Sequence, residues 1–247
     1  MALTRPGAIL RALLLLGTFH GAVAAAQIGV ELRPGREAAI TGLGLALHGT
    51  SWWRHDRNKG KPLPAIALDQ VPALDRVSTR QWSLPAHRSS NVLFGVATAA
   101  SLATAIISQD GERPMVPVVL VLESGLLVSG LTNTVKELAR RPRPYLYNPE
   151  VPTSAYHPGE DAVSFWSGHT ANMAAITFST AAIVQRSGAS QGMRTATWIG
   201  AAATPALMGY LRVRAGRHFP TDVLTGYLVG AAVGLLVPYI HRPKATR

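Results

Sequence analysis

Six apolar blocks, separated by charged stretches, constrain the fold of this chain more than any other feature. The blocks cover about residues 38–53, 91–108, 115–135, 170–185, 195–211 and 222–240. A helix needs about 20 apolar residues to cross a bilayer core, within a range of about 17–25. The blocks are also rich in Ala, Gly, Ser and Thr, which suit close helix packing in a membrane. We therefore expect an all-α, polytopic membrane bundle of about six helices, with a soluble protein of buried Ala-rich helices as the alternative.

The N-terminal segment resembles a targeting sequence. It reads "MALTRPGAILRALLLLGTFHGAVAAAQ", with Arg5 and Arg11 before an apolar run and small residues near Ala26. This order is typical of a secretory signal peptide with a cleavage site. An uncleaved membrane anchor is the alternative. We expect residues 27–247 to form a single domain, with its core at about 91–241.

The charge balance restricts the partners of the chain. The formal net charge is +11, which favours anionic partners such as nucleic acid, anionic lipid or phosphorylated substrates. The sequence contains no cysteine, which excludes disulfides, thiol catalysis and zinc–thiolate sites.

A basic motif, "KELARRPRP", stands at the end of the third block. Lys136 and Arg143 are seven residues apart, and Pro142 and Pro144 end the helix. The arginine fork matches phosphate oxygens, and lysine adds a point charge. The alternative is a basic flank that orients a membrane helix.

A second motif, "FWSGHTANM", opens the fourth block. Ser167 and Gly168 would place a hydroxyl and exposed backbone N–H groups at the positive end of a helix, which favours an anion. His169 could exchange a proton near neutral pH. The alternative is a serine N-cap beside an incidental histidine.

The third motif lies in "YLRVRAGRHFPTDVLTGYLVG". Arg212 precedes His218 by six residues, and Asp222 follows it by four. Pro220 fits the first turn of the sixth helix, so the carboxylate could fold back and hydrogen-bond one ring nitrogen. That bond would leave the other nitrogen as a nucleophile. A basic loop followed by a helix-start aspartate is the alternative. If each block crosses the layer once, all three motifs converge on one face.

Together, K-x6-R-P, S-G-H and R-x5-H-x3-D resemble the type 2 phosphatidic acid phosphatase superfamily, which also contains vanadium haloperoxidases and bacterial acid phosphatases. The resemblance spans about residues 115–234. Two positions depart from it: Trp166 stands where the family usually has Pro, and Leu211 where it usually has Ser. Both concern loop geometry and substrate fit rather than the reaction.

The resemblance implies a role for each matching residue. His218 would attack phosphorus and form a phosphohistidine, Asp222 would orient it, and His169 would protonate the leaving oxygen and then activate water. The residues implied to hold the phosphoryl oxygens are Lys136, Arg143, Arg212, Ser167 and Gly168. No metal ligand and no cofactor are expected at this site, since fixed cations neutralise the charge and the sequence shows no carboxylate cluster. Vanadate or phosphate could occupy it.

These residues predict a metal-independent phosphatase that hydrolyses a lipid phosphate monoester or diphosphate, such as phosphatidate, phosphatidylglycerol phosphate, an isoprenyl diphosphate or the phosphates of lipid A. The expected partners are the lipid substrate and the membrane, without nucleic acid or an obligate protein partner. The expected location is a bacterial-type cell membrane, with the site facing the periplasm or cell exterior. The alternatives are a soluble secreted acid phosphatase, a vanadate-dependent peroxidase, and a non-enzymatic transport or interaction protein.

Charged residues outside the motifs have simpler interpretations. Arg140, Arg141, Arg214 and Arg217 are expected to flank helices. Glu123 lies within the third block, where a carboxylate is either functional or paired with a polar group of a neighbouring helix. We expect the pairing.

Overall fold

A computed structural model describes residues 30–65, 67–109 and 115–243. The leader expected at residues 1–26 lies outside the described residues. The described part forms six α-helices and contains no strand. The α-helices are α2 (Pro34–Asn58), α3 (Leu84–Ile107), α4 (Met115–Ala139), α5 (Gly168–Val184), α6 (Gln191–Arg214) and α7 (Pro220–Ile240). Short 3-10 helices cover Leu68–Gln70, Arg76–Arg80, Pro144–Tyr147 and Thr153–Ala155.

A side-chain cap explains where α3 begins. The Oγ atom of Ser83 accepts a hydrogen bond from Ala86 N at 3.2 Å, and Pro85 occupies the first turn of α3. This cap starts α3 at Leu84, seven residues before the apolar block that predicted it. The connection between the first two helices is therefore shorter than the polar stretch 54–90 in the sequence.

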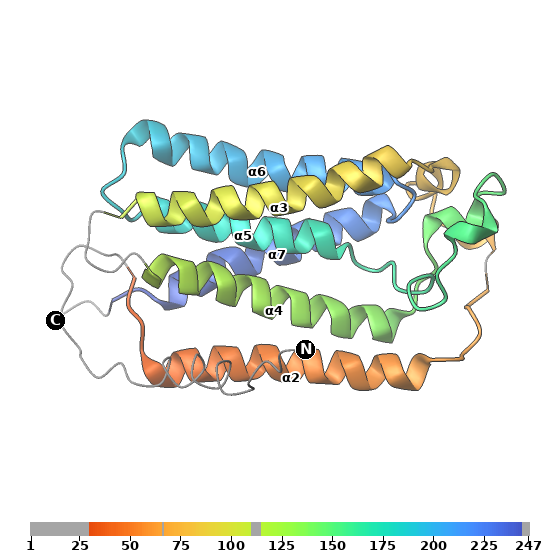
Figure 1. The fold of residues 1–247 in the computed structure, drawn as a ribbon, viewed down its shortest axis with the longest axis horizontal. Coiled ribbons are helices and arrows are strands. Elements are labelled where there is room, and N and C mark those ends of the chain that lie inside the picture. The colour runs from red at the N-terminus through yellow and green to blue at the C-terminus, as the bar shows by residue number, and fades with distance from the viewer. Residues whose placement is uncertain (1–29, 66, 110–114, 244–247) are drawn as a thin grey trace, which may run out of the picture.

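Successive helices run antiparallel to each other along the long axis of the bundle, as Figure 1 shows, and α5 lies at the centre. Thirteen of the 17 residues of α5 are buried, because α3, α4, α6 and α7 all pack against it. Helix α2 packs on α4 at the edge of the bundle. The short, small-residue helix α5 thus forms the axis around which the other helices position their ends.

Glycines let α7 approach α5 closely. Gly226, Gly230 and Gly234 recur every four residues on one face of α7. A Cβ atom at Gly230 would lie 2.1 Å from the carbonyl oxygen of Ala171, so a larger residue has no room there. This contact holds the start of α7 beside the start of α5.

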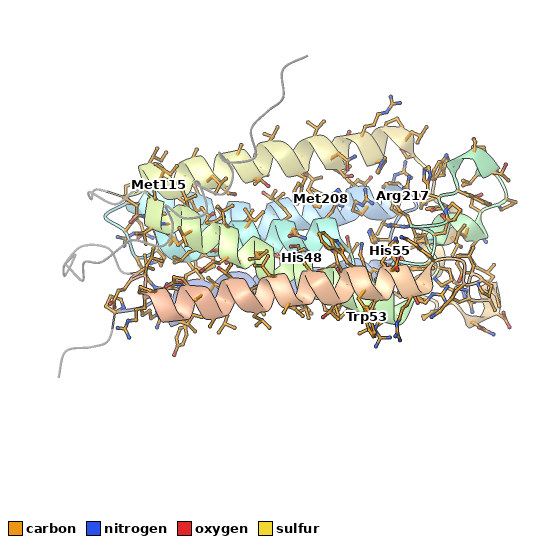
Figure 2. All side chains as sticks on the ribbon, turned by 60° about the horizontal axis from the view of Figure 1, so that its bottom comes forward. His48, Trp53, His55, Met115, Met208 and Arg217 are labelled. Carbon is orange, nitrogen blue, oxygen red and sulfur yellow. The ribbon has the colours of Figure 1, made fainter. Side chains whose placement is uncertain are left out.

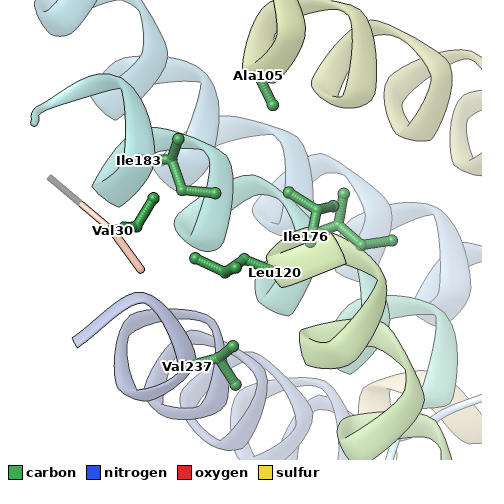
Figure 3. Close-up of a cluster of buried hydrophobic side chains, with 7 residues drawn as sticks. Val30, Ala105, Leu120, Ile176, Ile183 and Val237 are labelled. Carbon is green, nitrogen blue, oxygen red and sulfur yellow. The ribbon is translucent and has the colours of Figure 1, made fainter. Parts of the chain in front are cut away.

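A hydrophobic cluster fills one end of the bundle. Figure 3 shows Leu120 of α4, Ile176 and Ile183 of α5 and Val237 of α7 converging there, together with Val30 and Ala105. The motifs expected at the active site lie at the other end.

Three helices of the described part are long and apolar enough to cross a membrane: Leu84–Ile107, Met115–Tyr147 and Pro220–Ile240. Large apolar side chains point outward from the bundle, including Val92 of α3, Ile199 of α6 and Leu228 of α7, each at least 59% exposed. An outward apolar surface of this kind suits a lipid environment rather than water. The architecture is therefore that of a membrane bundle.

Candidate active site

The three sequence motifs meet at one end of the bundle. The ends of α4 and α6 and the beginnings of α5 and α7 lie there, on the right of Figure 1. Figure 2 shows Arg217 at this end and Met115 at the other. The alternation of helices predicted this convergence.

His218 has a defined tautomer in this structure. It is 1% exposed and follows a turn in which Gly216 has a φ of +68°. Its Nδ1 atom lies 2.8 Å from the carbonyl oxygen of Ser164, which can only accept, so Nδ1 carries the proton. The Nε2 atom therefore presents a lone pair, and it lies 3.5 Å from Arg143 Nη1.

The electrostatic surroundings keep this imidazole neutral. Burial lowers the pKa of His218 well below its usual value of 6.5, and the neighbouring charges of Arg143, Arg212 and Lys136 lower it further. A neutral ring with a free Nε2 lone pair is the form that a nucleophile needs.

Asp222 does not bind the histidine directly. Its Oδ2 atom lies 3.6 Å from His218 Nδ1, whereas it accepts hydrogen bonds from Ser164 Oγ at 2.5 Å and from Phe219 N at 2.9 Å. The expected direct bond from Asp222 to the ring is thus replaced by an indirect arrangement. Asp222 holds Ser164 and the backbone ahead of α7, and the carbonyl of Ser164 orients the ring.

Arg141 and Asp75 extend this arrangement, although the sequence motifs did not identify them. Arg141 Nη1 donates to Asp222 Oδ1 at 2.5 Å, and Nη2 donates to Asp75 Oδ2 at 2.7 Å. Asp75 is completely buried and also accepts from the backbone N–H of Thr221 at 3.0 Å. Arg141 is therefore a bridge between two buried carboxylates rather than a helix flank. Arg141 stands within the stretch "KELARRPRP", between the two motif positions, and this place in the sequence was the signal that could have identified it. Asp75 lies in the connection between α2 and α3, which contains no motif.

Arg143 and Arg212 are both buried near the nucleophile. Arg143 is held by the carbonyl oxygens of Glu160, at 2.7 Å from Nε, and Arg217, at 2.9 Å from Nη1. Arg212 Nη1 donates to His87 Nδ1 at 3.0 Å and to Ser90 Oγ at 3.1 Å. The Nε atom of Arg212 is buried without a hydrogen-bond partner in the described part of the chain. A buried guanidinium with an unused N–H group is ready to bind an anion.

The first turn of α5 completes the cationic side of the site. A Cβ atom at Gly168 would lie 3.5 Å from Lys136 Nζ, so the ammonium group sits against the backbone at the helix start. Ser167 is buried, and its Oγ atom caps α5 by accepting from Thr170 N at 3.4 Å. Trp166, at the position where the resemblance led us to expect proline, donates from Nε1 to Thr132 Oγ1 at 2.7 Å and packs in the bundle.

His169 lies on the side of the site that α3 covers. Its Nε2–H donates a hydrogen bond to Asn91 Oδ1 at 3.0 Å, so Nδ1 is the nitrogen left for proton exchange. The ring also contacts Phe94 edge-on, with the two ring centroids 5.6 Å apart. The ring is therefore fixed by residues of a helix that carries no sequence motif.

A carboxylate at the rim faces these cations. Glu160 Oε2 lies 3.6 Å from Arg217 Nη1 and 3.9 Å from Arg143 Nη2, and its side chain is 61% exposed. Arg217, which was expected to flank a helix, is buried and stacks over Tyr145, with 5.1 Å between the guanidinium carbon and the ring centroid. Glu160 thus neutralises part of the cationic site on its solvent side.

Glu123 is not part of this site. It lies toward the opposite end of the bundle, where its Oε2 atom is 3.3 Å from His241 Nε2. The expected pairing with a polar group is therefore an ion-pair contact only, because neither Glu123 oxygen has a hydrogen-bond partner in the described part of the chain.

Two comparisons with known proteins give a match, one to a family model and one to a solved structure. Residues 116–245 match the model of the PAP2 superfamily, which is more than half of the chain. The fold is similar to the crystal structure of the first transmembrane PAP2 type phosphatidylglycerolphosphate phosphatase from Bacillus subtilis. The TM-score is 0.50 at 20% sequence identity, over 80% of this chain and 94% of the other. No curated protein sequence matches. The fold comparison, together with the three apolar helices, confirms the expected all-α membrane bundle.

Proposed function

Because the chain belongs to the PAP2 superfamily, we propose that it is a membrane phosphatase that hydrolyses a lipid phosphate monoester or diphosphate without a catalytic metal. The observation that carries the proposal is the tautomer of His218. Its Nδ1 proton is engaged by the Ser164 carbonyl, and its Nε2 lone pair faces the Arg143 guanidinium. A nucleophile that faces a fixed cation is suited to attack a phosphoryl group.

The reaction would proceed in two steps. In the first, His218 Nε2 attacks phosphorus, the bond to the lipid oxygen breaks, and His169, protonated on both ring nitrogens in the substrate complex, gives its Nδ1 proton to that oxygen. In the second, His169 takes a proton from water, the water oxygen attacks phosphorus, and the phosphorus–nitrogen bond of the phosphohistidine breaks. Phosphate leaves, and both histidines return to their starting states.

The cations would stabilise the charge that develops on the phosphoryl oxygens. Arg143 and Arg212 are buried and fixed by contacts to other parts of the chain, so they need little reorganisation during the reaction. Lys136 would add a third positive charge beside the N-terminus of α5, where the amide of Gly168 and the hydroxyl of Ser167 also lie. This donor set supports a mechanism in which protein cations do the work of a metal ion.

The substrate class follows from the surroundings of the site. The apolar helices Leu84–Ile107 and Pro220–Ile240 begin at the end of the bundle where the phosphate would bind, so a lipid can present its headgroup from the bilayer. The similar solved structure is a phosphatidylglycerolphosphate phosphatase, which makes that lipid one candidate beside phosphatidate and isoprenyl diphosphates. We further propose that the site faces the cell exterior.

The test is phosphate release by detergent-solubilised protein in the presence of EDTA, over a panel of lipid phosphates and one water-soluble ester. We expect release from at least one lipid, and a loss of at least about 10³-fold in His218→Ala, as when a covalent nucleophile is removed. His169→Ala serves as the second variant, and thermal unfolding verifies that both variants fold. Release that persists in folded His218→Ala would refute the mechanism.

A further inference from the structure

Three side chains that are distant in the sequence meet at the end of the bundle opposite the active site. They are Glu37 in the first turn of α2, Glu123 in α4 and His241 just after α7. One ligand atom from each lies within 4.8 Å of the others. His241 and His218 stand beyond opposite ends of α7, so this cluster is about 30 Å from the nucleophile.

The hydrogen bonds within this cluster leave one carboxylate without a donor. His241 Nδ1 lies 2.6 Å from the carbonyl oxygen of Val237, so Nδ1 carries a proton and donates it. Nε2 has at most one further proton, and Glu37 Oε2 lies closest to it, at 2.7 Å. Glu123 Oε2 lies 3.3 Å from the same Nε2 atom and makes no hydrogen bond.

Glu123 is therefore exceptional among the described residues. Its side chain is 6% exposed, and neither carboxylate oxygen has a hydrogen-bond partner in the described part of the chain. The nearby guanidinium of Arg36 contacts Glu37 Oε1, at 3.1 Å from Nη2, and the carbonyl of Ile240, at 2.7 Å from Nη1. A buried carboxylate without a donor is costly, so a ligand that contacts it would be stabilising.

The other two side chains are already oriented as metal ligands are. A histidine that binds a metal through one nitrogen usually donates its other N–H to a carbonyl or carboxylate, as His241 does to Val237. The Oε1 atom of Glu37 is fixed by the backbone N–H of Arg33 at 2.7 Å, which directs Oε2 into the cluster. Two ligand atoms of a tetrahedral zinc ion lie about 3.3 Å apart, which matches the 3.3 Å between His241 Nε2 and Glu123 Oε2. Glu37 Oε2 lies 2.7 Å from the same nitrogen in a hydrogen bond, which the ion would replace.

We propose that Glu37, Glu123 and His241 form a binding site for a divalent transition-metal ion of the zinc type. Imidazole and carboxylate oxygens are ligands that Zn²⁺ accepts, and three protein ligands leave a fourth position for water. The ion would satisfy a free oxygen of Glu123 and would join α2, α4 and the C-terminal end of α7. It would be structural, because it lies far from the phosphate site.

The site was hidden from sequence analysis, which found no carboxylate cluster. The two glutamates and the histidine stand 86 and 118 residues apart along the chain, and no short motif links them. They also lie beside the hydrophobic cluster of Figure 3, since Glu123 follows Leu120 by one turn and His241 follows Val237 by one turn. An apolar surrounding of this kind lowers the local dielectric constant and strengthens the electrostatic interactions of a bound ion.

The test uses the full chain, purified in detergent without a polyhistidine tag and stripped of metal with a chelator. After dialysis against Zn²⁺ or Co²⁺, the bound metal is measured by mass spectrometry, and the visible absorption of Co²⁺ reports its coordination. We expect about one ion per chain and an affinity at least about tenfold lower in Glu123→Gln. This variant preserves the shape of the side chain and removes its charge.

The matched control is Glu137→Gln. Glu137 also lies on α4 and pairs with a histidine of α2, with 2.9 Å between Glu137 Oε1 and His55 Nδ1, but no third ligand joins this pair among the described residues. We expect Glu137→Gln to bind metal as the unmodified chain does. Equal binding by the unmodified chain and Glu123→Gln would overturn the proposal.

Thermal unfolding gives a second measurement that does not depend on the variants. A ligand that binds only the folded state raises the unfolding temperature, so Zn²⁺ should stabilise the stripped chain. If Zn²⁺ and Co²⁺ neither bind nor raise this temperature, the three side chains are a buried ion-pair cluster only, and the proposal is wrong.

Discussion

A single backbone carbonyl sets the chemistry of the candidate nucleophile. The Ser164 carbonyl oxygen accepts a hydrogen bond from His218 Nδ1–H, and Asp222 acts indirectly by accepting a hydrogen bond from Ser164 Oγ. Neither Ser164 nor its carbonyl belongs to the sequence motifs. The indirect arrangement still produces a neutral ring whose Nε2 lone pair faces Arg143.

The lowered pKa of His218 predicts a loss of stability in acid. In the unfolded chain the ring has a pKa of about 6.5, whereas burial and nearby cations hold the folded pKa well below that value. As the pH falls below about 6.5, the unfolded state takes up a proton that the folded state does not, so His218 contributes a destabilisation of up to about 1.4 kcal/mol per pH unit. Above that pH the contribution disappears.

The measurement compares unfolding temperatures of the unmodified chain and His218→Gln between pH 7.5 and pH 5. We expect a shallower decline in the variant, because glutamine has no proton to gain. Plotted against pH, the unfolding temperatures of the two chains should differ in slope below about pH 6.5 and run parallel above it. Parallel curves over the whole range would show that His218 titrates normally in the folded state.

Arg141 predicts a separate effect on turnover. Its planar fork contacts both Asp75 and Asp222, and lysine cannot span both carboxylates with one ammonium group. Arg141→Lys keeps the charge but loosens the support of His218. A misplacement of about 1 Å can reduce a rate about 100-fold, so we expect kcat to fall about 10- to 100-fold with a smaller change in KM.

The control for this variant is the neighbouring residue. Arg140 is on the surface, where its Nη2 atom donates to the carbonyl oxygen of Pro62 at 2.8 Å, and it has no contact with either aspartate. Arg140→Lys should leave kcat within about twofold, since exposed substitutions of this kind have little effect. A comparable loss of kcat in both variants would assign the effect to replacing arginine by lysine anywhere in this stretch rather than to the bridge.

At the scale of elements, the contact between α5 and α7 is the most demanding. A Cβ atom at Gly230 would lie 2.1 Å from the Ala171 carbonyl, and backbone atoms cannot yield as flexible side chains can. Overpacking typically costs about 1–3 kcal/mol, so Gly230→Ala should lower the unfolding temperature in detergent. It should also reduce activity, because α5 carries His169 and α7 follows His218.

A glycine in open space provides the comparison. Gly95 of α3 has nothing within 4 Å of a Cβ atom. Alanine is favoured over glycine in a helix by about 1 kcal/mol, so Gly95→Ala should leave the unfolding temperature unchanged or raise it. If Gly230→Ala also left the unfolding temperature unchanged or raised it, α5 and α7 would not approach each other as closely as the structure shows.

The sequence predicted the positions of the helices well, but it predicted contacts between distant residues less well. The six apolar blocks located the six described helices, because helix position depends on a local sequence pattern. The alternating direction of successive helices then predicted that the three motifs meet at one end. Ser83 extended α3 beyond its apolar block, which a hydropathy pattern cannot show. Asp75 and the Ser164 carbonyl could not be predicted, because a buried contact between two distant connections leaves no periodic signal.

At the scale of the whole molecule, charge is distributed unevenly along the bundle. In the described part of the chain, lysines and arginines are concentrated at the end that carries the site, and several of them are buried, Arg143 and Arg212 among them. The bias of positive residues toward the cytoplasm normally orients membrane proteins. Here phosphate binding accounts for part of the same positive charge, so counting lysines and arginines does not determine which end faces outward.

Labelling of single cysteines can determine the orientation. The sequence has no cysteine, so an introduced one is the only reactive thiol. Ser154 is exposed in the connection at the site end, and Gln191 is exposed at the start of α6, at the opposite end. If the site faces the cell exterior as proposed, a membrane-impermeant maleimide should label Ser154→Cys in intact cells and Gln191→Cys only after permeabilisation.

The two positions act as controls for each other, because α5 separates them by one passage through the bundle. The reverse pattern would place the phosphate site in the cytoplasm and would limit its substrates to lipids of that leaflet, without affecting the histidine chemistry. Labelling of both positions in intact cells would contradict a membrane passage between them. The proposed phosphatase would then need a topology in which α5, the short central helix, is enclosed by its neighbours without crossing the bilayer itself.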